Sequence, residues 1–403
     1  MDPRINSLFG LFCILMLAYL LSKDRKKVCF RTVAAGILLQ FLFAFFALKS
    51  NVGKNILTAI KDFVLIIIEQ SDYGARFVFG DHFQEHFFAF KVLPTIIFVS
   101  SLFYLLTYWG IIQKIVAVLS FIMSKTMRVS GVESLVAAIN VFVGQTEAPM
   151  VIRPYLAVMT KSEINVMMTA GMATVSGGVF AAYIGFGISA IHLISASLMA
   201  APTAILIAKI IYPETENPQT LGTSIAQIKV ADVNAFEAIC NGAAEGLKLA
   251  LNVAAMLIVF VSLVALINVV LGQFGEIGGH KLTFELLLGY LFRPLAFLIG
   301  VSWSECGIVG QLIGEKVVLN EFIAYLHLGE YMKAGMLSER TVMLATYALC
   351  GFANFSSIGM QVGGIGALAP SRKKDLASIG LRALLGGVLT NLMTACVAGI
   401  LVI

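Results

Sequence analysis

The sequence predicts an all-α membrane protein that crosses the bilayer about eight times. Of its 403 residues, 59% are hydrophobic and only 13% are charged, and the mean hydropathy is +0.91. A soluble domain carries roughly a quarter charged residues, and it cannot hide so large an apolar fraction because much of any folded surface stays exposed. The apolar residues are grouped in runs, of which about eight reach the roughly 20 residues that one crossing needs.

The first basic cluster indicates how the chain is oriented. An apolar run over residues 8–21 is followed by basic residues between Lys23 and Arg31. Positive charges are enriched in cytoplasmic loops, so we expect the N-terminus outside and, after eight crossings, the C-terminus outside as well. The net charge of +5 is small for this length, which argues against a nucleic-acid partner and leaves the lipid bilayer as the expected surroundings.

Residues 1–90 are predicted to hold two spans and one helix that does not cross. The spans are residues 8–21 and 32–48. No small-residue cleavage site precedes the basic cluster, so the first span is not expected to be removed as a signal peptide. Residues 51–70 mix charged with apolar side chains. This composition predicts a helix lying in the interface, and we expect a loop over residues 71–90.

The rest of the chain consists of apolar segments separated by polar linkers. The clearest linker, residues 213–233, is rich in Thr, Pro, Glu and Gln and precedes a long predicted helix over residues 235–270. The other apolar segments that we expect to be helical are 92–109, 164–187, 190–211, 284–301, 341–367 and 376–403. Shorter apolar pieces between them cannot reach across a bilayer.

Two of these short pieces carry a carboxylate where hydropathy predicts membrane depth. Glu147 lies in the piece from Asn140 to Pro149, and Glu321 follows Asn320. Each piece is followed, at a similar distance, by a span interrupted by glycine. The segment 171–176 (Gly-Met-Ala-Thr-Val-Ser) is similar to 351–356 (Gly-Phe-Ala-Asn-Phe-Ser). The order of carboxylate and interrupted helix therefore occurs twice, which indicates an internal repeat.

The cost of these carboxylates makes them candidates for a functional site. A charged side chain at the centre of a bilayer costs at least about 2.5 kcal/mol. Irregular backbone at that depth is tolerated only where it lines protein or a water-filled cavity, and secondary transporters build midplane sites from broken helices in two repeats. The alternative is that Glu147 and Glu321 only reach the interface or cap the tips of hairpins.

The polar residues near the breaks suggest the class of ligand. The candidate set is Gln145, Thr146, Glu147, Glu321, Asn354 and Ser357. It combines hydrogen-bond donors and acceptors but has no cationic side chain, so a neutral solute with hydroxyls or a heterocycle fits better than an anion. Sugars, nucleosides and neutral amides all remain possible on these grounds.

At these residues the sequence resembles the concentrative nucleoside transporter family. The motifs that carry the resemblance are Gly144-Gln-Thr-Glu-Ala-Pro149, Asn320-Glu-Phe322 and Cys350-Gly-Phe-Ala-Asn-Phe-Ser-Ser-Ile358. They occur in the family's order, and the likeness extends from residue 31 to residue 399. The short chain looks like a bacterial member, which implies a multi-pass protein of the bacterial inner membrane.

The resemblance implies an architecture of eight spans, two re-entrant hairpins and an inverted internal repeat. It further implies a homotrimer, in which a scaffold holds a mobile, elevator-type transport domain. The corresponding division is N-terminal spans and interfacial helix (1–90), scaffold span and connection (91–130), first repeat with a hairpin and two spans (131–212), cytoplasmic linker (213–234), long scaffold helix (235–283) and second repeat with a hairpin and two spans (284–403).

The resemblance also assigns the residues that bind substrate. The side chains expected to face the nucleobase are Gln145, Thr146 and Glu147, with Val179 beside them. The side chains expected to bind ribose hydroxyls are Glu321 in the second hairpin, Asn354 and Ser357. Leu249 and Phe352 are expected to pack against the ligand. Glu305 is expected near the tip of the second hairpin.

A sodium site follows from the same resemblance, on Asn140, Val143, Thr174 and Val175. Side-chain and backbone oxygens at these positions are the neutral ligands that hard cations prefer. Thr174 replaces the serine of some bacterial relatives and keeps a hydroxyl. Proton-coupled relatives lose the asparagine and the hydroxyl, whereas this chain has both, so sodium is favoured as the coupling ion.

The sequence therefore predicts a secondary active symporter, not an enzyme, that imports nucleosides such as uridine with sodium. The close alternative is the same carrier driven by protons through Glu147 or Glu321. A membrane-embedded enzyme that uses the two glutamates as an acid–base pair is a further alternative, although no nucleophile or metal group accompanies them. Gly144 and Val179 leave room for both purine and pyrimidine bases.

Overall fold

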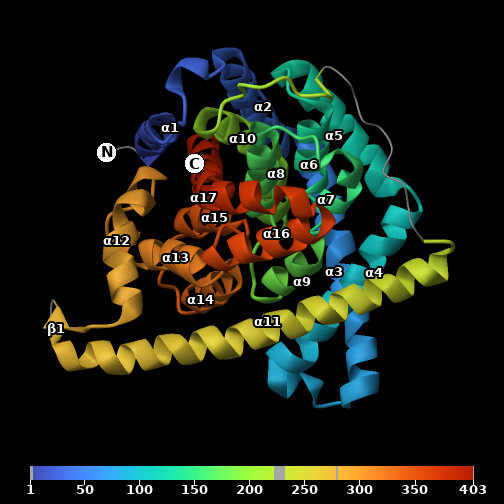
Figure 1. Cartoon of the computed structure of the whole chain (residues 1–403). Coiled ribbons are helices and arrows are strands. Elements are labelled where there is room, and N and C mark those ends of the chain that lie inside the picture. The colour runs from blue at the N-terminus through green and yellow to red at the C-terminus, as the bar shows by residue number, and fades with distance from the viewer. Residues whose placement is uncertain (1–2, 222–231, 278–279, 403) are drawn as a thin grey trace.

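The computed structural model describes residues 3–221, 232–277 and 280–402, and most of them are helical (Figure 1). The helices of the first half are α1 (Pro3–Leu20), α2 (Phe30–Leu48), α3 (Asn51–Phe79), α4 (Leu93–Tyr108), α5 (Ile111–Met127), α6 (Gly131–Ile139), α7 (Ala148–Val151), α8 (Lys161–Ala173), α9 (Gly177–Gly185) and α10 (Ala190–Ile211). Those of the second half are α11 (Ala235–Leu271), α12 (Phe284–Leu298), α13 (Cys306–Val318), α14 (Glu321–Lys333), α15 (Glu339–Leu349), α16 (Phe355–Leu368) and α17 (Lys373–Leu401).

Short turns and one small hairpin connect these helices. The 3₁₀ and π turns are Arg25–Lys27, Phe83–His86, Phe87–Val92, Arg153–Tyr155, Gly272–Phe274 and Pro370–Arg372. The antiparallel strands β1 (Glu276–Ile277) and β2 (His280–Lys281) follow α11. The two strands have two residues each and pair only with each other, so the predicted all-α class is confirmed.

Seven stretches of the described chain are long and apolar enough to cross a membrane. They are Pro3–Leu20, Phe30–Leu48, Phe88–Tyr108, Lys161–Gly185, Ala190–Ile211, Ala235–Phe274 and Pro370–Leu401. The fourth stretch consists of α8 and α9 with a break between them. The pair α15 and α16 is broken in the same way and corresponds to the predicted apolar segment 341–367.

The order of elements occurs twice along the chain. Helices α5 to α10 run from a short helix through a hairpin and an interrupted helix to a long buried helix, and α12 to α17 do the same. Corresponding pairs are in contact, since α5 packs on α6 as α12 packs on α13, and α6 packs on α8 as α13 packs on α15. The repeat inferred from the glycine motifs is thus a repeat of packed helices.

Helices α10 and α17 form the centre of the molecule (Figure 1). Both are apolar on nearly all sides and mostly buried, as expected for a helix enclosed by others. They pack on each other and on α8, and α2 and α1 cover their outer sides. This central group supports the ends of both interrupted helices and so determines where the two breaks meet.

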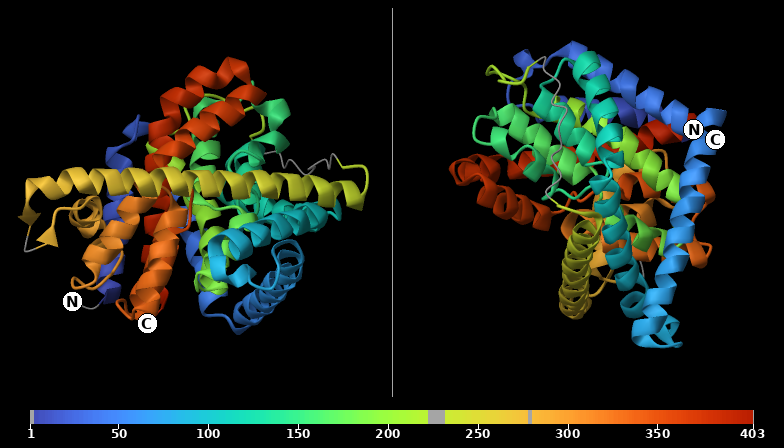
Figure 2. Two further views of the ribbon diagram at one scale, coloured as in Figure 1. Left: turned by 90° about the horizontal axis from the view of Figure 1, so that it is seen from below. Right: turned by 90° about the vertical axis from the view of Figure 1, so that its right-hand side faces the viewer.

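The long helix α11 runs across one side of the molecule from end to end (Figures 1 and 2). It packs extensively against α4, because Gly242 and Gly246 allow the two backbones to approach closely. A Cβ atom on these glycines would lie 2.7 Å from the Cα of Ser101 and 2.8 Å from the Cα of Ile97. The other side of α11 exposes large apolar side chains, such as Leu251 and Ile258.

Three expectations about the connections can be compared with the structure. The predicted loop over residues 71–90 is wrong in its first part, because α3 continues to Phe79 after its serine cap at Ser50. The expected position of Glu305 is also wrong: α13 and α14 form the second hairpin, its tip is at Leu319 and Asn320, and Glu305 precedes the first arm. Residues 222–231 of the predicted linker 213–234 lie outside the described residues.

Glu305 instead connects the start of α13 to the start of α15. Its carboxylate accepts hydrogen bonds from the Ser338 amide at 2.7 Å and from the Thr341 hydroxyl at 2.5 Å. Apolar spacing along the chain could not separate this position from a hairpin tip, since both are short polar turns beside an apolar helix.

The start of α1 and the end of α17 lie beside each other (Figure 2). A Cβ atom added to Gly399 would come within 2.5 Å of the Ser7 hydroxyl. An even number of crossings places both ends of a chain on one side of a membrane, so this arrangement agrees with the predicted number of spans.

Candidate functional site

The two interrupted helices meet at their breaks. The amide of Phe352, in the break between α15 and α16, donates a hydrogen bond of 3.1 Å to the carbonyl of Thr174, at the end of α8. Asn391 of α17 donates from its amide nitrogen to the carbonyls of Ala173 and Cys350, both at 2.7 Å. One side chain therefore satisfies two of the carbonyls that helix ends leave without an intrahelical partner.

Gly351 allows this close approach. A Cβ atom at this position would lie 2.5 Å from Asn391 Oδ1 and 2.7 Å from the Met172 carbonyl. Both distances are far below van der Waals contact, and backbone is one of the two neighbours. The glycine of the second motif is therefore required by the crossing of the two breaks as well as by the interruption of the helix.

We expect Gly351→Ala to lower the free energy of unfolding by about 1–3 kcal/mol through overpacking. Thermal unfolding of the purified protein measures this loss. The matched control is Gly363→Ala on α16, where an added Cβ atom meets nothing within 4 Å and should be neutral or slightly stabilising. Equal unfolding temperatures for the two variants would contradict the close crossing of the breaks.

The first hairpin is held by local caps and by the break of α8 and α9. Helix α6 begins with a capping box, in which Ser130 and Glu133 satisfy each other's amides, and it ends at Asn140. The Phe142 carbonyl accepts from the Gly177 amide at 3.0 Å, which attaches the turn of the hairpin to the start of α9. The second arm, α7, has Pro149 in its first turn, where the missing amide costs little.

Gln145 connects the first hairpin to the second interrupted helix. Its amide nitrogen donates to the Ser357 hydroxyl at 2.9 Å, and its oxygen accepts from Gln361 at 2.9 Å. Gln361 also donates to the Met168 carbonyl of α8 at 3.2 Å. Gly171 makes room for this group, because a Cβ atom there would lie 2.8 Å from the Gln361 amide nitrogen. The structure thus brings together two predicted residues that are 212 positions apart.

Glu321 is buried at the first position of α14, behind the tip of the second hairpin. Its carboxylate accepts from the Tyr183 hydroxyl at 3.0 Å and from the Asn354 amide at 3.3 Å. The partial positive charge of the helix N-terminus also favours a carboxylate here. Asn354 in turn caps α16 by accepting from the Ser357 amide at 2.9 Å. Three predicted residues, Glu321, Asn354 and Ser357, therefore lie in one connected group.

The remaining predicted contacts are placed less directly. Glu147 accepts from the Gly144 amide of its own turn at 3.2 Å, so its carboxylate lies over the turn. Thr146 lies against α16, where a Cβ on Gly364 would be 3.2 Å from its methyl group. Val179 is buried on α9. A Cβ atom on the neighbouring Gly178 would lie 3.4 Å from Cδ2 of Leu249 on α11.

The residues predicted to bind a cation lie at the end of α6, in the turn after it and at the end of α8, which packs on α6. Asn140 is buried and donates to the Val136 carbonyl at 2.9 Å, while its Oδ1 has no hydrogen-bond partner among the described residues. The Thr174 hydroxyl donates to the Ala170 carbonyl at 2.9 Å, which leaves its lone pairs available. Val143 and Val175 flank these side chains in the two irregular segments. The donor set consists of neutral oxygens and therefore fits an alkali cation.

Sequence reasoning missed four buried polar residues at this site. They are Tyr183, Lys316, Gln361 and Asn391. Each is a polar side chain inside an otherwise apolar segment, and this contrast is the sequence feature that could have identified it. Their partners are 32 to 218 positions away along the chain, so the chain alone did not indicate what they contact.

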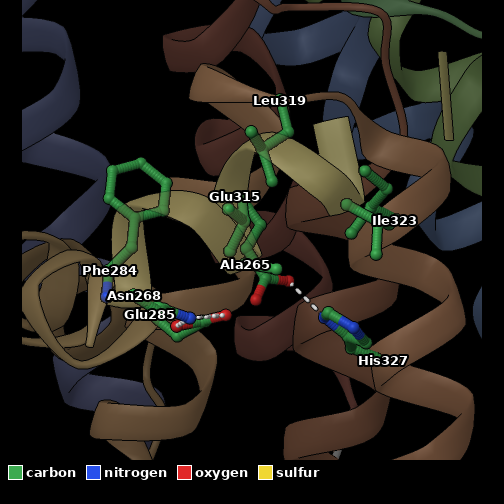
Figure 3. Close-up of a pocket in the computed structure, with 10 residues that line it drawn as sticks. Ala265, Asn268, Phe284, Glu285, Glu315, Leu319, Ile323 and His327 are labelled. Carbon is green, nitrogen blue, oxygen red and sulfur yellow. Dashed lines mark hydrogen bonds and ion pairs between the residues drawn. The ribbon is translucent and has the colours of Figure 1, made fainter. Parts of the chain in front are cut away.

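A separate cavity of about 190 Å³ lies between α11, α12 and the second hairpin (Figure 3). In it the carboxylate of Glu315 pairs with His327 at 2.9 Å, and Asn268 donates to Glu285 at 3.0 Å. None of the predicted site residues lines this cavity. At its rim Val264 of α11 packs on Leu319 and Ile323 of the hairpin.

Three family models match the chain, and together they cover nearly all of it. They are described as the N-terminus of a Na⁺ dependent nucleoside transporter over residues 9–82, a nucleoside recognition (Gate) domain over residues 89–190, and the C-terminus of a Na⁺ dependent nucleoside transporter over residues 192–399.

Curated relatives and solved structures agree with these matches. Solute carrier family 28 member 3 of Mus musculus is 43% identical over 415 residues, covering 99% of this chain and 59% of that protein. An uncharacterised transporter of Haemophilus influenzae is 43% identical over 413 residues, covering 99% and 98%. The chain thus spans about three-fifths of the animal relative's length.

The transporter CNTnw has been solved in several states that match this fold. Its inward-facing, substrate-bound structure has a TM-score of 0.91 and 42% identity, covering 98% of both chains. The outward-facing structure of a variant has a TM-score of 0.92 and 41% identity, covering 98% of this chain and 97% of that one.

Proposed function

Because the chain belongs to the family of concentrative, sodium-dependent nucleoside transporters, we propose that it imports nucleosides together with sodium ions. The observation that carries this proposal is the convergence of both carboxylate motifs and both helix breaks on one group of residues. Membership in a transporter family also excludes the alternative of an embedded enzyme that uses Glu147 and Glu321 as an acid–base pair.

In this proposal the second motif recognises the sugar. A carboxylate accepts hydrogen bonds from vicinal hydroxyls, and Glu321 is held for that task by Tyr183 and Asn354. The hydroxyl of Ser357 provides a further donor and acceptor beside them. A ribose is the part of a nucleoside that offers such neighbouring hydroxyls, so these three polar side chains support the ribose assignment.

The first motif recognises the base. Gln145 and Thr146 present amide and hydroxyl groups, and Glu147 presents a carboxylate, which together can match the donors and acceptors on a nucleobase edge. Val179, Leu249 and Phe352 supply apolar surface for the ring. This mixed set of polar groups suits a pyrimidine edge as well as a purine edge. A pyrimidine nucleoside is therefore an adequate probe, and we choose uridine.

Sodium is the proposed coupling ion because of the free oxygen on Asn140. A buried amide oxygen without a partner is costly, and a cation held also by Thr174 and by the carbonyls of Val143 and Val175 removes that cost. Inward movement of one charge through 100 mV releases about 2.3 kcal/mol, and a tenfold sodium gradient adds about 1.4 kcal/mol. Together these terms support an accumulation of roughly several hundredfold.

The contacts of α11 support an elevator-type movement. This helix packs extensively on α4 but only lightly on α12, and it meets the second hairpin through the small apolar group of Val264, Leu319 and Ile323. Such a contact permits sliding with little loss of specific bonds. We therefore assign residues 235–283 and 91–130 to the scaffold, and the two repeats, 131–212 and 284–403, to the moving domain.

The exposed apolar face of α11 fits a homotrimer in a lipid bilayer. Large side chains such as Leu247, Leu251 and Ile258 lie on this face, where they can contact a second copy of the chain or lipid.

We propose the bacterial inner membrane as the location of the protein. The basic cluster after the first span supports an orientation with the N- and C-termini outside.

Uptake of radiolabelled uridine into proteoliposomes tests the proposed function. We expect uphill uptake under an inward sodium gradient and none under an inward proton gradient in potassium buffer. Uptake with protons alone would keep the family assignment but transfer the coupling to Glu147 or Glu321. The absence of uptake under either gradient, with protein shown to be folded, would mean that the substrate is another compound.

A further inference from the structure

Gln361 is a fully buried polar residue on α16 that is not among the residues expected to touch the ligand. None of its surface is exposed, and its amide nitrogen donates to Gln145 Oε1 at 2.9 Å and to the Met168 carbonyl at 3.2 Å. Its own Oε1 is buried without a hydrogen-bond partner among the described residues. A buried oxygen in that state costs stability, so the contribution of Gln361 comes from the two hydrogens on its nitrogen.

The Met168 carbonyl fixes the orientation of the Gln361 amide. A backbone carbonyl can only accept hydrogen bonds, so the nitrogen of Gln361, and not its oxygen, has to face it. The second hydrogen of that nitrogen then goes to Gln145 Oε1. Gln145 in turn donates from its own nitrogen to the Ser357 hydroxyl oxygen at 2.9 Å. These hydrogen bonds therefore run in one direction, from Gln361 through Gln145 to Ser357.

This direction decides what Ser357 offers to a ligand. A hydroxyl has one hydrogen, and because the Ser357 oxygen accepts from Gln145, that hydrogen is available for donation; no described residue accepts it. Glu321, which is connected to Ser357 through Asn354, is a carboxylate and only accepts. A group that binds to both has to donate to Glu321 and accept from Ser357, and a sugar hydroxyl does both.

The packing around the two glutamines indicates that position 361 is used for its hydrogens. A Cβ atom on Gly171 of α8 would lie 2.8 Å from the Gln361 amide nitrogen and 2.9 Å from Gln145 Cβ, so a glycine stands where the two side chains meet. An apolar side chain at position 361 could fill the same space without leaving a buried oxygen unpaired. Packing by itself therefore does not account for glutamine at this position.

We propose that Gln361 is a positioning residue for nucleoside binding. It holds the Gln145 amide in the orientation that faces the base and keeps the Ser357 hydroxyl as a donor to the sugar. Because Gln361 has no exposed surface, it acts through Gln145 and not by contact with the ligand. This inference rests on the proposed function. Its consequence is that the base motif and the sugar motif are set by one directed series of hydrogen bonds.

Equilibrium binding of radiolabelled uridine to the purified protein tests this role. Gln361→Met keeps the length of the side chain but has no hydrogen to donate, so the Gln145 amide loses its fixed orientation. We expect the affinity for uridine to fall about tenfold, the effect of roughly one hydrogen bond. The maximal rate of uptake into proteoliposomes should be retained, because the cation residues and both helix breaks are unchanged.

A double-mutant cycle measures whether Gln361 acts through Gln145. In Gln145→Met there is no amide to orient, so adding Gln361→Met should not lower the affinity further. A role that only packs α16 against α8, through the Met168 carbonyl, would instead lower the affinity by the same factor with and without Gln145. Additive losses of this kind would overturn the proposal, and so would natural affinity in a folded Gln361→Met protein.

Gln361→Glu is a second variant, with nearly the shape of the natural side chain. A carboxyl group carries at most one hydrogen, whereas Met168 and Gln145 both take one from Gln361. This variant should therefore also lose affinity for uridine, and only while Gln145 is present. A loss of the same size in the absence of Gln145 would contradict the proposal.

The matched control is Gln40→Met on α2. Gln40 is also fully buried, donates to Thr394 at 3.5 Å and has an Oε1 without a partner among the described residues. Its replacement should leave the affinity for uridine unchanged, and an equal loss here would overturn the proposal. A folded natural protein that binds no uridine would overturn the proposed function as well, whereas natural binding with additive losses would overturn the role of Gln361 alone.

Discussion

Replacing Glu321 by glutamine is expected to abolish nucleoside uptake. The carboxylate accepts from Tyr183 on one oxygen and from Asn354 on the other. The amide of glutamine has a single oxygen, so it can accept from only one of these two donors. Its NH₂ group then faces the other donor. Loss of one charged hydrogen bond to the ribose and one mismatched buried pair costs about 3 kcal/mol or more, which is roughly a hundredfold in affinity.

Uridine binding by the purified protein and uptake into proteoliposomes measure this effect. Glu330→Gln is the matched control, because Glu330 lies on the same helix α14 but is exposed. It should bind and transport as the natural protein does. Undiminished affinity for uridine in a folded Glu321→Gln protein would show that this carboxylate does not bind the ribose.

The second large effect is expected from Asn140→Leu, which should uncouple the protein from sodium. Leucine has the same number and branching of side-chain heavy atoms as asparagine but no oxygen, so the cation loses its one side-chain amide ligand. A ligand present at 100 times its dissociation constant stabilises a protein by about 2.7 kcal/mol. Sodium, compared with choline, should therefore raise the unfolding temperature of the natural protein but not that of Asn140→Leu, and uptake should no longer respond to sodium.

Asn165→Leu separates this loss from a general loss of stability. Asn165 is also buried, donates to a carbonyl at 3.0 Å and has an Oδ1 without a partner among the described residues. It lies within α8, away from the break at Thr174, and is not one of the proposed sodium ligands. The variant should be less stable, but it should keep the response to sodium. A sodium response that persists in Asn140→Leu would place the ion elsewhere.

The comparison of motifs with structure shows which kinds of feature a sequence can reveal at this site. The breaks near Thr174 and Asn354 were predictable because glycine and polar residues interrupt an apolar helix locally. The position of Glu305 was not, because the turn before α13 and the tip at Asn320 have the same local pattern. Only the packing of α13 on α15 distinguishes them.

The same limit explains which site residues were missed. Gln361 and Asn391 lie in helices that are otherwise apolar, and nothing near them in the chain indicates a partner. Their partners include Gln145 and Ala173, at separations of 216 and 218 positions. Contacts of this kind depend on how the two repeats pack, since each side chain is useful only where the other repeat places its counterpart.

The sequence by itself determined the class of protein, the spans, the two breaks and the two carboxylate motifs. These are properties of short segments: hydropathy, helix interruption and the type of polar group follow from neighbouring residues. Only the tertiary structure decided that Gln145 meets Ser357, that Tyr183 holds Glu321 and that Lys316 reaches Asn391. The physical reason is that buried polar groups must find partners, and in this fold the partners come from helices that are distant in sequence but packed together around α10 and α17.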